Sequence, residues 1–125
     1  MNGKILLFGF EDLPSIAAVG AVAQRNGVDM VPVLRTEYNK TLGVLAGISK
    51  PRIQPPPFAG GSLGGRMIVF CQLEDKLDAL LEDLRRSGIG PECLKAVLTP
   101  HNQEWNAVAL YAELWGEHQA LNRKR

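Results

Sequence analysis

The sequence lacks the features that identify several large classes of protein. Its 125 residues include two cysteines, Cys71 and Cys93, which form neither a C-x-x-C pair nor a spacing typical of metal ligands. No apolar run approaches the ~18 residues of a membrane span. Met1 to Lys4 lead into a strand pattern without the apolar core of a signal peptide. We therefore expect a cytoplasmic chain without a membrane partner, in which both thiols are reduced and buried.

A strong charge of either sign is also missing. Fourteen basic residues are balanced by 13 acidic residues, and the formal net charge is +1. Such a chain has no basic field for phosphate backbones, so we expect no nucleic-acid partner. The basic sequence at 123–125 is a local exception. We interpret it as cations at the end of a helix, where the macrodipole favours them.

Motifs for phosphates and cofactors are not found either. The sequence has no G-x-G-x-x-G motif before a helix and no P-loop. The glycine-rich stretch 60–65 precedes a predicted strand rather than a helix, so its backbone is in the wrong context to hold a phosphate. We expect no cofactor and no metal ion.

Apolar runs and helical patterns alternate along the chain. Short apolar runs predict buried strands at residues 4–10, 30–34, 66–73 and 94–98. Apolar residues at helical spacing follow each of them, over residues 12–27, 36–48, 74–88 and 105–122. Residues 49–65, rich in proline and glycine, predict a long loop. The length favours a single domain, residues 1–125.

The second half of this order repeats the first. KILLF at 4–8 corresponds to RMIVF at 66–70, and Asn39 corresponds to Asn102. The offset between matching residues stays between 62 and 64 positions. We interpret the two halves as an internal repeat of one βαβα unit, at residues 4–48 and 66–115.

Right-handed crossovers within two such units predict an α/β fold. The predicted sheet has four strands in the order 2-1-3-4, with helices on both faces. Pro32 cannot donate a hydrogen bond to a neighbouring strand, which places the second strand at an edge. We favour an all-parallel sheet, because a helical pattern follows every strand. The alternative is a ferredoxin-like α+β sandwich with added helices, in which the two central strands are antiparallel.

In a parallel sheet, the turns after all four strands project from the strand carboxyl edge, where open α/β sheets bind ligands. Polar side chains in two of these turns are the candidate ligand-binding residues: Tyr38, Asn39, Thr99, His101 and Asn102. Structural interpretations stand beside this one. The asparagines are typical of turns and helix caps, and Thr99 followed by Pro100 fits the start of the final helix.

Two residues are candidates for catalysis. His101 is a candidate general base if a carboxylate such as Glu104 or Glu37 orients it. Cys71 is a candidate nucleophile if a helix N-terminus or a positive neighbour lowers its pKa. The alternatives are a histidine that only occupies a helix start, and a small buried residue at the end of a central strand.

Four motifs carry a resemblance to a known family: KILLFGF at 4–10, EYNKTLG at 37–43, MIVFC at 67–71 and, above all, LKAVLTPHNQEW at 94–105. In these motifs the chain resembles the bacterial family catalogued as domain of unknown function 3783. The resemblance extends from about residue 4 to residue 114. It implies no particular activity, substrate or cofactor.

These observations leave three functions open. The first is an α/β domain that binds a small molecule or a partner protein at the strand carboxyl edge, since no catalytic constellation is complete. The second is a small enzyme that uses His101 as a general base. The third is an interaction module that forms a homodimer through the apolar stripe of the final helix, which includes Trp105 and Trp115. Core packing is the alternative explanation of that stripe.

Overall fold

The computed structural model describes residues 3–50, 56–61 and 63–123, and the side chains of these residues as far as Ala120. Residues 51–55 and 62 of the predicted loop, and the last two basic residues, lie outside the described residues. The strands are β1 (Lys4–Phe8), β2 (Asp29–Pro32), β3 (Met67–Cys71) and β4 (Leu94–Val97). The helices are α1 (Leu13–Arg25), α2 (Leu42–Leu45), α3 (Leu77–Arg86) and α4 (Ala107–Arg123). Short 3-10 helices, η1 (Arg35–Glu37) and η2 (Asn102–Glu104), precede α2 and α4.

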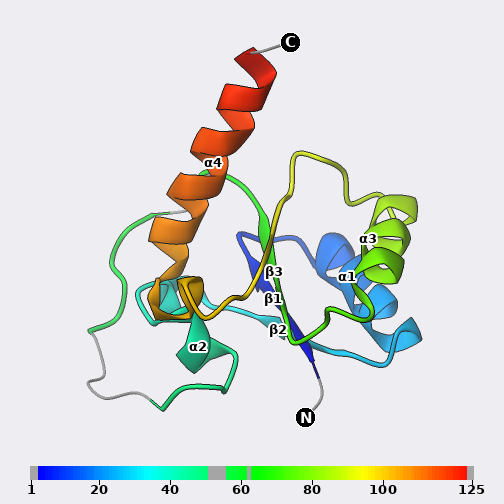
Figure 1. Cartoon of the computed structure of the whole chain (residues 1–125), viewed down its shortest axis with the longest axis horizontal. Coiled ribbons are helices and arrows are strands. Elements are labelled where there is room, and N and C mark those ends of the chain that lie inside the picture. The colour runs from blue at the N-terminus through cyan, green and yellow to red at the C-terminus, as the bar shows by residue number, and fades with distance from the viewer. Residues whose placement is uncertain (1–2, 51–55, 62, 124–125) are drawn as a thin grey trace.

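The four strands form one open sheet in the order β2-β1-β3-β4, with helices on both faces (Figure 1). β1 pairs with β2 in parallel, and β3 pairs with β4 in parallel, whereas the central strands β1 and β3 are antiparallel. The predicted α/β class and strand order are therefore confirmed. The prediction of an all-parallel sheet was wrong, because the sheet is mixed.

The direction of the central strands follows from the face that each helix covers. Two right-handed βαβ units that extend in opposite directions across a parallel sheet place their helices on opposite faces. Turning one unit over brings both helices to the same face. In this chain α1 and α3 share one face, where Arg25 of α1 pairs with Asp83 of α3 at 2.7 Å. The two units are therefore antiparallel to each other.

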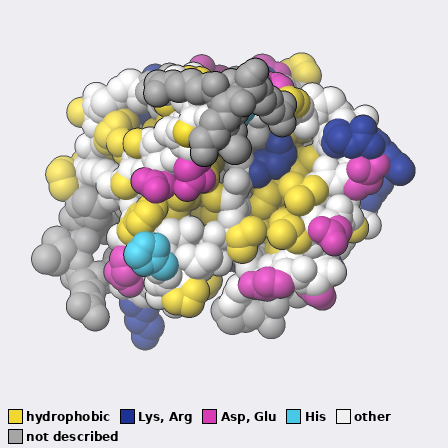
Figure 2. Space-filling view, turned by 45° about the horizontal axis from the view of Figure 1, so that its top comes forward, with side chains coloured by type: hydrophobic (Ala, Val, Ile, Leu, Met, Phe, Trp, Pro, Cys, Tyr) yellow, Lys and Arg dark blue, Asp and Glu magenta, His cyan; other side chains and the backbone are white. Residues whose placement is uncertain are grey.

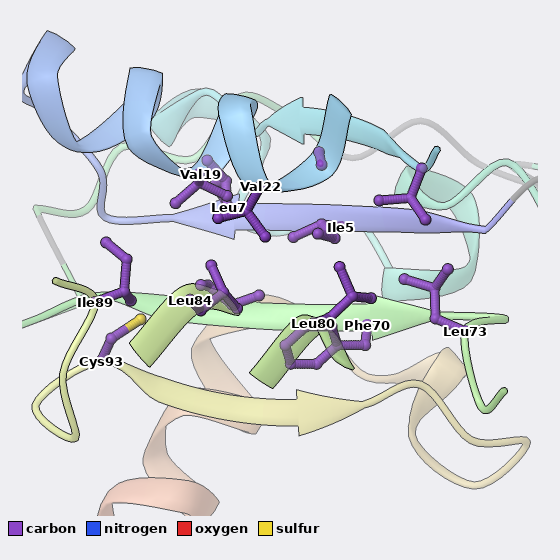
Figure 3. Close-up of a cluster of buried hydrophobic side chains, with 13 residues drawn as sticks. Ile5, Leu7, Val19, Val22, Phe70, Leu73, Leu80, Leu84, Ile89 and Cys93 are labelled. Carbon is purple, nitrogen blue, oxygen red and sulfur yellow. The ribbon is translucent and has the colours of Figure 1, made fainter. Parts of the chain in front are cut away.

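The face beneath α1 and α3 is one hydrophobic cluster (Figure 3). Side chains of both central strands and both helices meet there and are at most 1% exposed: Ile5, Leu7, Val19, Val22, Ile68, Phe70, Leu80 and Leu84. Burying a side chain of this size stabilises the fold by about 1.5–3 kcal/mol. The leucines of α3 recur at helical spacing, which is why its pattern in the sequence predicted this helix correctly.

The opposite face carries the second hydrophobic cluster, beneath α2 and α4. The alternate residues of the central strands point to it and contact side chains of the segments that follow β2 and β4: Leu6, Phe8, Met67, Val69, Cys71, Tyr38, Leu42, Ala107 and Leu110. Successive strand residues face opposite sides of a sheet. Because both sides are covered, the central strands are apolar at every position.

The register of the central pair has its midpoint at Leu6, which lies opposite Val69. At the two ends, Lys4 lies opposite Cys71 and Phe8 lies opposite Met67. The pairing is thus symmetric under the offset of 62 to 64 residues found in the sequence. The duplication itself stays a prediction, with this symmetry in its favour.

Residues 36–48 form η1 and the short α2 instead of the one helix that was predicted. The final helix, predicted at 105–122, begins at Ala107, and Thr99 with Pro100 precedes η2 instead of starting the final helix. Asn106 caps α4, because its Oδ1 accepts a hydrogen bond from the backbone N–H of Ala109 at 2.9 Å. Among the described residues, no helix is both long enough and apolar enough to cross a membrane.

Both edge strands carry features that oppose pairing with another strand. Pro32 lies at the end of β2, at the edge of the sheet as predicted, and has no N–H to donate. Along β4, the Val97 carbonyl accepts a hydrogen bond from Asn102 Nδ2 at 3.1 Å. The Cys93 carbonyl, just before β4, accepts one from Lys95 Nζ at 2.9 Å. These side chains occupy acceptors that an incoming strand would use.

Candidate functional site

The turns that follow the strands lie at two opposite edges of the sheet, because β1 and β3 are antiparallel. β1 and β2 end at one edge, and β3 and β4 end at the other. A single strand carboxyl edge, on which the predicted ligand site depended, is therefore absent from the described sheet. Tyr38 and Asn39 follow β2, whereas Thr99, His101 and Asn102 follow β4, so the two groups belong to different edges.

Tyr38 belongs to the core rather than to an open site. Its side chain is 4% exposed, and its ring contacts Phe8 and Phe58 with centroid distances of 5.7 and 6.0 Å. Its hydroxyl accepts a hydrogen bond from the backbone N–H of Gly9 at 2.8 Å. Both the ring and the hydroxyl of Tyr38 therefore hold the turn between β1 and α1.

The amide and hydroxyl groups of the other polar candidates close turns. Thr99 and Asn102 bond reciprocally: the Thr99 backbone N–H donates to Asn102 Oδ1 at 2.8 Å, and the Asn102 backbone N–H donates to Thr99 Oγ1 at 3.1 Å. Asn39 Nδ2 donates to the carbonyl of Pro56. The ligand-binding role of these residues stays a prediction, and each has a structural partner in this fold.

The segments after β2 and β4 do meet, over the second cluster rather than at an edge. Thr41 and Asn106 form an isolated antiparallel bridge, and the Leu42 N–H donates to the Trp105 carbonyl at 2.8 Å. Thr41 caps α2 by accepting from the Val44 N–H at 3.4 Å, as Asn106 caps α4. This pair was not predicted from the sequence. The available signal was a polar capping residue directly before each apolar helical stretch.

His101 is exposed, and its ring packs edge-on against Trp105 with a centroid distance of 5.2 Å. Within the described part of the chain, its imidazole makes no hydrogen bond or ion pair. Of the two carboxylates considered as partners, Glu37 instead pairs with Lys40 at 2.8 Å. The orienting partner that a general base needs is therefore not provided by the described residues.

Cys71 is 1% exposed at the end of β3. Burial raises the pKa of its thiol to about 12, an effect that the nearby charge of Lys4 only partly offsets. A thiol with this pKa is protonated at neutral pH, and the protonated form is a poor nucleophile. The environment of Cys71 therefore supports the alternative interpretation, a small buried residue.

Metal binding has no visible basis in the described ranges. No three residues among their histidines, cysteines, aspartates and glutamates gather closely enough to hold a metal ion.

Residues 66–121 match the model of a protein family described as Domain of unknown function (DUF3783). The second half of the chain is thus similar to this domain, over somewhat less than half of the chain's length. The matched residues comprise β3, α3, β4, η2 and nearly all of α4, and they include Cys71, His101 and Asn102. Residues 4–65 lie outside this match, so the resemblance at KILLFGF and EYNKTLG stays a prediction. Comparisons with curated proteins and with solved structures gave no match.

The last helix, α4, extends beyond the rest of the molecule (Figure 1). Ala107 and Leu110, in its first turn, are buried against the sheet, whereas no side chain from Tyr111 to Ala120 is buried. Figure 2 shows hydrophobic side chains open to solvent on one face of the molecule, with acidic groups around them. Trp115 of α4 is one of the exposed large hydrophobic residues, at 44%.

Aromatic rings are stacked along this part of α4. Trp115 stacks on Tyr111 with a centroid distance of 6.5 Å and on His118 with a distance of 5.7 Å. Tyr111 and Leu114 are half-buried and pack against the margin of the second cluster. We name these four residues, Tyr111, Leu114, Trp115 and His118, the α4 stripe. Their spacing of i, i+3, i+4 and i+7 places them on one side of the helix.

Proposed function

We propose that this chain is a protein-interaction module and that the α4 stripe is its binding surface. The observation that carries the proposal is the stack of Tyr111, Trp115 and His118 on the part of α4 that extends beyond the sheet. Tryptophan and tyrosine are enriched among the residues that dominate protein–protein binding energy. A half-exposed tryptophan held between two rings is a surface of this kind.

The stack also lowers the cost of binding. Immobilising a flexible side chain at an interface costs about 0.5–1.5 kcal/mol, and rings that already contact each other lose less freedom. Contact with a partner would also stabilise the extended part of α4. Helical segments shorter than about 12–15 residues are marginal in water without packing, and of residues 111–120 only Tyr111 and Leu114 pack against the margin of the second cluster.

The edges of the sheet favour side-chain surfaces over strand addition. Pro32 at one edge, and the hydrogen bonds of Asn102 and Lys95 at the other, oppose pairing with a strand from another protein. Helix surfaces are therefore the better route for association. His101 without an orienting partner and Cys71 with a raised pKa give weaker support to an enzyme.

Photocrosslinking from the stripe tests the proposal. Trp115 is replaced by a photoreactive benzoyl-phenylalanine, which keeps an aromatic ring at the centre of the stripe, and the chain is irradiated in the cells that produce it. We expect covalent adducts of defined mass with one protein, identified by mass spectrometry.

The matched control places the same photoreactive residue at Ala109, an exposed position on the opposite side of α4. Ala109 is nine positions from His118, about half a turn out of phase. Adducts from position 115 that are absent from position 109 support the proposal. Equal adducts from both positions, or no protein adduct from position 115, would contradict it.

A further inference from the structure

Asn26 and Gly27 follow α1 directly and form an Asn-Gly pair. In such a pair the asparagine can lose its amide spontaneously, because glycine has no side chain to hinder attack by its backbone nitrogen. The Gly27 nitrogen gives up its proton and bonds to Cγ of Asn26, the Cγ–Nδ2 bond breaks, and ammonia leaves. Water then opens the five-membered imide at either carbonyl, which yields aspartate or isoaspartate. The reaction needs no oxidant and no cofactor.

We propose that Asn26–Gly27 is a site of spontaneous deamidation that the folded chain protects, and that its conversion loosens the contact between α1 and α3. The pair lies at the end of α1, on the face of the sheet opposite to α4. The proposal is therefore independent of the α4 stripe and its binding function.

The backbone at the end of α1 keeps the attacking nitrogen away from its target. Ring closure requires the Gly27 nitrogen to eclipse Cβ of Asn26 about the Cα–C bond. With a ψ of 3°, it eclipses the backbone nitrogen of Asn26 instead, about a third of a turn from Cβ. The Gly27 N–H also donates to the Gln24 carbonyl at 3.2 Å, and Lys76 Nζ donates to the Asn26 carbonyl at 3.0 Å. The last turn of the helix must therefore open before attack.

The side-chain amide of Asn26 is held by both helices. Its Nδ2, the leaving group, donates to the Val22 carbonyl at 2.8 Å and to Asp83 Oδ2 at 3.1 Å. Arg25 fixes this carboxylate, because its Nη2 donates to Asp83 Oδ1 at 2.7 Å. The amide must leave both acceptors before it can turn towards the Gly27 nitrogen. The contact with α3 thus contributes to the protection of the site.

Deamidation replaces a hydrogen-bond donor by a negative charge at this contact. The hydrogen bond from Arg25 holds the pKa of the Asp83 carboxyl below its usual value, so Asp83 is ionised at neutral pH. A carboxylate at position 26 cannot donate to Asp83 or to the Val22 carbonyl, and it repels the Asp83 charge. The product therefore has a weaker contact between α1 and α3, and the lost amide is not restored.

The rate of deamidation in the full chain is the first test. Samples are kept folded in neutral buffer or unfolded in guanidinium chloride, and mass spectrometry follows the peptide that contains residue 26. We expect the folded chain to react more slowly by on the order of tenfold or more, because the reaction waits for local opening. Equal rates in both samples would overturn the protection, and an unfolded chain that never reacts at residue 26 would overturn the site. The Asn-Gly pair at 2–3 is the positive control in the unfolded sample.

Asp83→Ala tests the contribution of α3. This variant removes an acceptor of the Asn26 amide, so it should deamidate several times faster than the original chain while folded. Arg25→Ala leaves the carboxylate in place but unfixed, and should act in the same direction. Glu82→Ala is the matched control, since Glu82 pairs with arginines of α3 itself. Circular dichroism checks that each variant is folded. If Asp83→Ala and Arg25→Ala react no faster than Glu82→Ala, α3 does not protect the site.

Asn26→Asp reproduces one product of the reaction and tests its consequence. We expect the Tm to fall by roughly 3–8 °C, and by less in Asn39→Asp, where a single exposed hydrogen bond is lost. Adding Asp83→Asn to Asn26→Asp places one amide and one carboxylate at the contact again and should recover part of the loss. An Asn26→Asp chain as stable as the original, or a double variant less stable than Asn26→Asp alone, would contradict the loosening of α1 from α3.

Discussion

Gly9 and Gln72 each follow a central strand directly, and both have a positive φ, 77° and 59°. Glycine adopts this left-handed region without strain, whereas other residues lose about 1–2 kcal/mol there. Gly9 has a second constraint, because a Cβ at this position would lie 2.2 Å from the Gly65 carbonyl oxygen. The same backbone turn is therefore relaxed after β1 and strained after β3.

We predict opposite effects of substitution at these two turns. Gln72→Gly should raise the free energy of unfolding by up to about 1 kcal/mol, because it removes backbone strain. Gly9→Ala should lower it by more than about 2 kcal/mol, because strain and a clash with backbone are added. Urea unfolding of both variants measures the difference. A Gln72→Gly variant that is less stable than the original chain would show that the Gln72 side chain holds the turn.

The two thiols give a prediction for alkaline pH. Burial raises the pKa of Cys71 to about 12 and that of Cys93 to about 11, from an ordinary value of 9.0. The unfolded chain therefore loses these protons first, and stability is full below about pH 9 and is lost as the pH rises towards 11 and 12.

Between pH 8 and pH 10, we expect the free energy of unfolding to fall by on the order of 1 kcal/mol for each thiol. Replacing both cysteines by alanine should make the pH dependence shallower, although the baseline stability changes. Urea unfolding across this range, with the alanine variant as the control, provides the measurement. An unchanged slope in the alanine variant would mean that other groups, such as Tyr111 with its raised pKa, control the effect.

At the scale of elements, the segment between β4 and α4 depends on Asn102. Its side chain and backbone make three hydrogen bonds, two with Thr99 and one with the Val97 carbonyl. We predict that Asn102→Ala destabilises the chain by about 1–2 kcal/mol, because the side-chain hydrogen bonds to the Thr99 N–H and the Val97 carbonyl are lost. Asn39→Ala removes one exposed hydrogen bond, to the Pro56 carbonyl, and should lower the free energy of unfolding by less. If thermal unfolding shows that both variants lose the same stability, the role given to Asn102 is contradicted.

The sequence predicts elements well where their pattern is set by their own residues. α3 has leucines at helical spacing, and its bounds were found to within a few residues. The start of α4 was found to within two residues, whereas residues 36–48 were predicted as one helix and form η1 and α2. The bridge between Thr41 and Asn106 joins residues that are far apart in the sequence, and a local pattern cannot reveal it. Thr99 and Pro100 have residue types that are typical of a helix start, but they lie in a turn.

At the scale of the molecule, the strand order was predictable but the strand direction was not. Pro32 and the continuously apolar central strands indicated which strands lie at the edge and which lie inside. The same apolar pattern fits parallel and antiparallel neighbours, because both are buried on two faces. The same ambiguity bears on the candidate site, since the strand direction decides whether Tyr38 and Asn102 share an edge of the sheet. The apolar stripe that contains Trp115 was visible in the sequence, with core packing and a homodimer contact as its two explanations, and in the fold Trp115 is 44% exposed.

The antiparallel pairing of β1 with β3 has a consequence for synthesis of the chain. Leu6 finds its partner Val69 only after the intervening residues have been translated. At about 5–20 residues per second, β1 waits roughly 3–13 s with one side unpaired. During this interval the nascent chain exposes KILLF, an apolar segment of the kind that is prone to aggregation. Newly made molecules therefore need rapid completion, or a chaperone at the ribosome, more than finished ones do.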